Sequence, residues 1–208
     1  MRWLLLVLLT VPAWAQPPGY EFIQHRGSLC RLAPESLPWR LYSNDPAFFQ
    51  VTLHCVRTWN AAGHAAGMPD LFSLVDSPSS AQLVIDWSGR NLPPDKAAAV
   101  WWNTDGTRPR IVGLTIDPDR RLPVGNLAQI LLQELGHILG LDHSDRREDV
   151  MYRVMQTRRY PNLQAAELSA RDLAAFRWLY VQPHYLAMLG PFEQDTPAVP
   201  EPSFTPIP

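Results

Sequence analysis

The sequence has few charged residues, almost no net charge and only two cysteines. Charged residues make up 18% of the 208 positions, and the formal net charge is −2. A chain without a basic surplus creates no overall field that would attract nucleic acid, so we expect no nucleic-acid partner. Apolar residues make up 46% of the chain, which is enough for one sizeable hydrophobic core.

Long apolar runs are also absent, except for a short one at the start. One positive charge at Arg2 precedes an apolar run that ends at Leu9, and Ala13 and Ala15 supply small residues where a signal peptidase reads them. The run is too short to remain in a bilayer. Residues 1–15 are therefore predicted to be a cleaved signal peptide, and the protein to be secreted or periplasmic without a membrane anchor.

The two cysteines lie 25 positions apart and have no close-spaced partner that would suggest a metal site. Export into an oxidising compartment favours a disulfide between Cys30 and Cys55. Two buried free thiols are the alternative.

The spacing of apolar residues predicts helices and strands between irregular ends. Residues 16–36 are expected to be an irregular lead-in, and 183–208, with 7 prolines, an extended and disordered tail. Asp45 and Asn126 suit helix N-caps, Gly140 suits a helix end, and Ser169 begins a capping box. The expected helices are 46–62, 127–139 and 169–181, and the expected strands are 38–42, 71–75, 82–87, 99–102 and 111–116.

One segment, from Gln133 to Ser144, carries the pattern of a metal centre. Positions 133 and 137 are one helical turn apart on the same face. Gly140 lets the chain leave the helix, so that His143 can approach the same point, while Glu134 stands beside it. Three ligand positions, an adjacent carboxylate and one open coordination site are typical of a hydrolytic zinc centre.

Glu134, His137, Gly140 and His143, followed by Val150-Met151-Tyr152, resemble the metzincin signature and its Met-turn. The detail is closest to the matrixins, because Trp59-Asn60, Leu168-Ser169 and Leu179-Tyr180 are also similar. The resemblance covers residues 37–181, and we expect a single domain over 37–182. It implies an α+β fold with a mixed, twisted sheet of about five strands, two long helices packed on it and a C-terminal helix.

The resemblance also implies a function. His137 and His143 would bind Zn²⁺, Glu134 would be the general base of peptide hydrolysis, and Met151 would form a floor beneath the metal. The strand near 100–102 would bind a protein or peptide substrate as an added strand, and the enzyme is expected to be monomeric. Structural Ca²⁺ is compatible with this family, although the sequence shows no site for it.

Gln133 departs from the family pattern, which has histidine at the first ligand position. A carboxamide oxygen is a neutral, hard donor that suits zinc less well than imidazole does. One interpretation is a zinc endopeptidase in which Gln133, or a water, is a weak third ligand. The other is a pseudoprotease that keeps the fold and uses the cleft to bind a peptide or protein partner.

Overall fold

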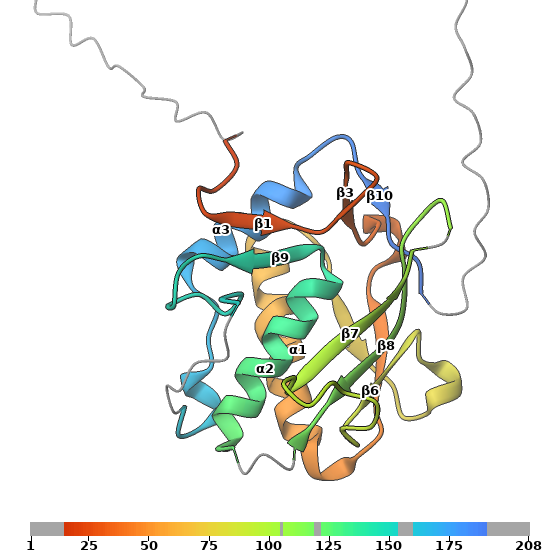
Figure 1. Ribbon diagram of the computed structural model, residues 1–208, viewed down its shortest axis with the longest axis vertical. Coiled ribbons are helices and arrows are strands. Elements are labelled where there is room, and N and C mark those ends of the chain that lie inside the picture. Colours follow the sequence, from red (N-terminus) through yellow and green to blue (C-terminus); the bar gives the residue numbers. More distant parts are fainter. Residues whose placement is uncertain (1–14, 105, 119–121, 154–159, 191–208) are drawn as a thin grey trace, which may run out of the picture.

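A five-stranded mixed sheet forms the centre of the computed structural model, which describes residues 15–104, 106–118, 122–153 and 160–190 (Figure 1). Its order is β5-β4-β6-β8-β7, and β7 is antiparallel to β8 while the other neighbours are parallel. The strands are β4 (Trp39–Ser43), β5 (Phe72–Leu74), β6 (Leu83–Asp86), β7 (Ala98–Asn103) and β8 (Arg110–Ile116).

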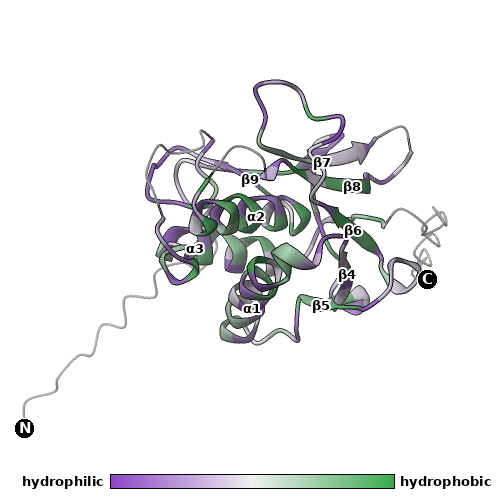
Figure 2. Ribbon diagram, turned by 90° about the horizontal axis from the view of Figure 1, so that it is seen from below, coloured by the Kyte–Doolittle hydropathy of each residue, from purple (hydrophilic) through white to green (hydrophobic). Residues whose placement is uncertain are grey.

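Among the described residues, three α-helices accompany the sheet: α1 (Phe49–Ala65), α2 (Val124–Ile138) and α3 (Ala170–Tyr180). Helices α1 and α2 lie side by side on one face of the sheet and turn their hydrophobic sides toward it (Figure 2). Trp59 of α1 is fully buried, and its indole Nε1 donates to the Leu132 carbonyl of α2 at 3.0 Å. The predicted α+β fold with a five-stranded mixed sheet is confirmed.

The predicted signals for the starts of helices hold at two places and fail at a third. Asp45 accepts a hydrogen bond from the Ala47 backbone, although the chain first makes a 3-10 turn, Pro46–Phe48, before α1 begins. The capping box of Ser169 and Asp172 at the start of α3 is present. Asn126 is not an N-cap, because α2 begins earlier; its buried amide oxygen instead accepts from the Tyr160 backbone at 3.0 Å.

Residues 16–36 were predicted to be an irregular lead-in, and this prediction is wrong where the segment forms three short strands. They are β1 (Tyr20–Phe22), β2 (Gln24–His25) and β3 (Ser28–Arg31). Strand β1 pairs antiparallel with β9 (Leu141–Ser144), which follows α2, as Figure 1 shows. The lead-in is therefore part of the folded unit and lies beside the predicted metal ligands.

The first part of the predicted tail is also ordered. Strand β10 (Leu186–Ala187) pairs in parallel with β3, and Met188 and Leu189 are buried. The Arg31 guanidinium lies 3.9 Å from the ring centre of Tyr185 and holds this segment to β3. Residues 191–208 and residues 1–14, which include most of the predicted signal peptide, lie outside the described residues. In the described part of the chain, no helix has the length and hydrophobicity needed to cross a membrane.

The predicted disulfide is wrong, since Cys30 and Cys55 are both free and buried. The Cys55 thiol on α1 faces α2 and lies 3.3 Å from the Ala128 carbonyl oxygen, whereas Cys30 lies in β3 and donates to the Ser28 carbonyl. Burial raises the pKa of both thiols, that of Cys30 to about 11. Both cysteines therefore act as small core residues.

Candidate active site

Helix α2 and strand β9 together carry the predicted ligands. Gln133 and His137 lie one turn apart on α2, and the helix ends where Gly140 adopts a φ of +100°. The Gly140 N–H still donates to the His137 carbonyl at 2.9 Å, and the chain then turns back into β9. This reversal brings His143 against His137.

The two imidazole rings have the separation that one shared ion requires. Their centres lie 5.0 Å apart, and their planes are inclined by 75°. Two imidazoles bound through Nε2 to one tetrahedral zinc ion, with Zn–N bonds of about 2.0 Å, would place their ring centres about 5 Å apart. The Nδ1 of His137 lies 2.9 Å from the Leu141 carbonyl oxygen, so Nε2 remains as its ligand atom.

Burial sets the charge of the groups around this point. It lowers the pKa of His137 to about 4, which keeps the imidazole neutral and able to bind a metal near neutral pH. It raises the pKa of Glu134 to about 7, against a backbone hydrogen bond from Val100 and the positive charge of Lys96. Glu134 is 8% exposed and can exchange a proton near neutral pH.

Gln133 lies in the same cleft, and its side-chain amide makes a hydrogen bond to the backbone. Its Nε2 donates to the Tyr152 carbonyl at 3.2 Å, so the carboxamide oxygen Oε1 is the atom available to a cation. Two imidazoles and one amide oxygen fit a zinc ion with one weak protein ligand. The structure thus brings together all four predicted residues, Gln133, Glu134, His137 and His143.

The cleft that contains these groups has a volume of about 620 Å³ and runs between α2 and β7. Strand β7 forms the edge of the five-stranded sheet, so its outer edge can pair with another strand. The two tryptophans of β7 differ: Trp102 lines the cleft, whereas the Trp101 indole bonds to the Thr115 hydroxyl at 3.0 Å. Sequence reasoning missed Lys96 and Arg153, which also line the cleft.

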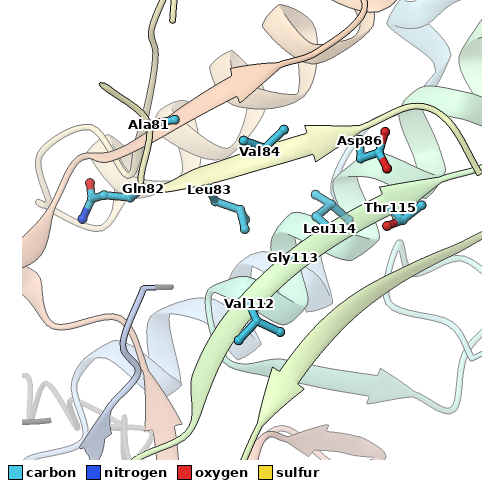
Figure 3. A pocket seen from close by; sticks show the side chains of 9 residues that line it. All are labelled: Ala81, Gln82, Leu83, Val84, Asp86, Val112, Gly113, Leu114 and Thr115. Atoms are coloured by element: carbon cyan, nitrogen blue, oxygen red, sulfur yellow. The ribbon is translucent and has the colours of Figure 1, made fainter. Parts of the chain in front are cut away.

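A second cavity, of about 240 Å³, lies between β6 and β8 (Figure 3). It is lined mainly by apolar side chains such as Val84, Val112 and Leu114, and Asp86 is the carboxylate among its lining residues. The Asp86 carboxylate already accepts hydrogen bonds from Asn44 and Ser88. This cavity therefore differs from the cleft of α2, whose lining includes Glu134, His137 and His143.

The Met-turn packs directly beneath the helix that carries the ligands. Met151 is fully buried, and its sulfur lies so close to Gly136 that a Cβ at position 136 would collide with it. The buried Asp172 carboxylate accepts from the Val150 and Met151 backbone N–H groups at 2.9 and 3.4 Å. Helix α3 thus holds the turn in place, and the role of Met151 as a floor beneath a metal stays a prediction.

Tyr20 connects the N-terminal strand to the same carboxylate. Its hydroxyl donates to Asp172 Oδ1 at 2.5 Å, and its side chain is buried. Replacing Tyr20 with Phe should lower the free energy of unfolding by about 1.5–3 kcal/mol, because a hydrogen bond to a buried charge is lost. Denaturant unfolding measures this. Tyr42→Phe, at a half-buried tyrosine, is the control and should cost less; an equal loss in both variants would contradict the expectation.

Gly140 is the residue whose replacement should most disturb the path from α2 to β9. Its φ of +100° strains any other residue, and a Cβ there would collide with the Cys30 carbonyl oxygen. We expect Gly140→Ala to lower the free energy of unfolding by more than about 3 kcal/mol. Gly67→Ala is the matched control, because Gly67 has φ +75° but open space around its Cβ position, and only about 1–2 kcal/mol should be lost. Similar losses in both variants would show that the contact with Cys30 is unimportant.

A comparison with protein families now bears on this geometry. The model of the matrixin family matches residues 93–181. This region is matrixin-like. The match covers β7, β8, α2, β9, the Met-turn and α3, and therefore every predicted ligand and Glu134. It supports a domain of the zinc-dependent metalloendopeptidase type. No curated protein matches the sequence. The match begins at residue 93 and ends at 181, so it does not test the predicted domain boundaries at 37 and 182. Strands β1 and β10 lie outside those boundaries but pair with β9 and β3.

Proposed function

We propose that the protein is an exported, zinc-dependent endopeptidase, with His137, His143 and Gln133 as metal ligands and Glu134 as general base. The observation that carries this proposal is the convergence of His137 and His143, with ring centres 5.0 Å apart, beside the buried Glu134 carboxylate. Two imidazoles and a buried carboxylate in one cleft are the donor set and the base that a hydrolytic zinc centre needs.

The edge of β7 supplies a binding site for the substrate backbone. An extended peptide that pairs with this edge would lie across the cleft, because β7 and α2 form its two walls. Main-chain hydrogen bonds recognise any extended peptide, so the substrate class is an unfolded or loop segment of a protein. The side chains of Lys96, Trp102 and Arg153 then contact the substrate from the cleft walls.

The chemistry divides between the metal and Glu134. His137, His143 and Gln133 would hold the zinc ion, which would supply Lewis-acid polarisation of the scissile carbonyl and of a water molecule. Glu134 accepts the proton of the attacking water and passes it to the amine that leaves when the C–N bond breaks. Its pKa of about 7 suits both transfers, since the carboxylate must take up and release a proton at one working pH.

A pseudoprotease is the second candidate function, and Gln133 is the observation that favours it. The amide oxygen is a weak zinc donor, and the hydrogen bond from Gln133 Nε2 to Tyr152 stabilises the side chain without any metal. In that case the cleft and the β7 edge would bind a peptide without cleaving it.

A proteolysis assay with chelation separates the two functions. We expect the purified chain to cleave an unfolded protein substrate, to lose that activity with a zinc chelator, and to regain it when zinc is restored. Binding of the peptide without cleavage, both before and after zinc is added, would favour the pseudoprotease. Cleavage that continues unchanged in the chelator would contradict the metal mechanism.

A further inference from the structure

We propose that Asp142 is a positioning residue, whose carboxylate keeps the His143 proton on Nδ1 and so directs the Nε2 lone pair into the cleft. This inference rests on the proposed function, because it assigns Asp142 a task toward the same metal site. Asp142 immediately precedes the ligand on β9 and lines the cleft with it.

The contact between the two side chains determines which ring nitrogen carries the proton. Asp142 Oδ1 lies 2.8 Å from His143 Nδ1, and the same oxygen accepts from the His143 backbone N–H at 2.8 Å. The backbone bond fixes the carboxylate relative to β9. An ionised carboxylate only accepts hydrogen bonds, so Nδ1 must be the protonated nitrogen of the neutral ring.

Glu21 is the other carboxylate at this place, and it has another partner. Its carboxylate oxygen lies within 4.8 Å of the ligand atoms of Asp142 and His143. However, Glu21 is paired with Arg153, whose Nη2 lies 3.0 Å from Glu21 Oε2. The Arg153 guanidinium balances the Glu21 charge, and Asp142 is left as the hydrogen-bond partner of the ring.

The two histidine ligands therefore differ in what supports them. His137 Nδ1 bonds to a neutral backbone carbonyl, that of Leu141, whereas His143 Nδ1 bonds to a carboxylate. A carboxylate partner makes an imidazole a stronger metal donor and fixes its orientation. This support has particular value here, because the neutral amide of Gln133 is a weak third donor.

Nuclear magnetic resonance of the imidazole nitrogens tests the tautomer in the metal-free chain, at a pH above the ordinary histidine pKa. We expect His143 to be protonated on Nδ1 in the wild type and to shift toward the Nε2-protonated form in Asp142→Ala. Asp142→Asn should keep the Nδ1 proton, because its amide oxygen still accepts. Glu21→Gln is the matched control and should change nothing. An Nδ1 proton retained in Asp142→Ala would overturn the proposal.

Zinc affinity provides the second measurement, in a chain carrying Gln133→His to strengthen the site. Asp142→Ala should weaken zinc binding by about 10–100-fold in competition with a coloured chelator, while Asp142→Asn should lose less. Equal affinities in all three chains would overturn the positioning role. If none of the chains bound zinc, the proposed function would fail, and the tautomer spectra would still decide the role of Asp142. Asp142→Ser replaces the alanine variant if that variant does not fold.

Discussion

Replacing Glu134 with Gln is expected to lower turnover of a peptide substrate by about 10²–10⁴-fold, the usual contribution of a general base. The amide has nearly the same size and keeps the contact with the Val100 backbone as an acceptor, but it cannot take up the proton of the attacking water. Because Glu134 is not assigned as a ligand, zinc content and the free energy of unfolding should change little. Turnover, zinc content and unfolding are measured on the same preparation.

Glu148→Gln is the matched control for this variant. Glu148 is an exposed carboxylate in the loop after β9, outside the residues that line the cleft. Its replacement should leave turnover as it is. A Glu134→Gln protein as active as the Glu148→Gln protein would show that proton transfer depends on another group.

Gln133→His is expected to raise zinc affinity by at least about 10–100-fold. Loss of a residue that only hydrogen-bonds to a ligand already lowers metal affinity by that factor, and a direct ligand should contribute at least as much. An imidazole replaces the amide oxygen one turn before His137, where it can complete a set of three nitrogen donors. The variant loses the hydrogen bond from Gln133 to Tyr152, a small cost beside the gain in metal binding. Isothermal titration with zinc measures the change.

Gln133→Leu is the companion variant, since it removes the donor atom but keeps a side chain of similar size. Its zinc affinity should fall below that of the wild type if the amide oxygen ligates the metal. Equal affinities in the Leu variant and the wild type would instead mean that water occupies the position. A Gln133→His variant that gains both zinc and turnover, from a wild type with neither, would identify the native chain as a pseudoprotease.

The main elements could be predicted because their signals are local. Helix α1 has an Asp-Pro start and a regular apolar face, and β8 is rich in apolar and β-branched residues. The short strands β1, β3 and β10 have no such signal, since they contain two to four residues and depend on partners far along the chain. The disulfide prediction was wrong for another reason. It was inferred from export into an oxidising compartment, which does not determine whether Cys30 and Cys55 lie close together in the fold.

The candidate ligands and Glu134 could be predicted because they all lie in one continuous segment, residues 133–144. Helical geometry and one left-handed glycine are local features, and they place Gln133, His137 and His143 within reach of one another. The groups that support them come from elsewhere in the chain. Asp172 of α3 accepts hydrogen bonds from the backbone of the Met-turn, and Tyr20, which lies 152 positions from Asp172, donates to that carboxylate. Neither residue has a spacing or a neighbour in the sequence that would reveal this role.

X-ray absorption at the zinc edge, on the purified chain loaded with one equivalent of zinc, tests the metal site most directly. The predicted spectrum has two imidazole ligands, from His137 and His143, with the remaining first shell made of oxygen. Replacing both histidines with alanine should abolish the imidazole signal. A zinc ion without imidazole ligands, or a chain that holds no zinc even with Gln133→His, would contradict the assignment of this cleft as a metal centre.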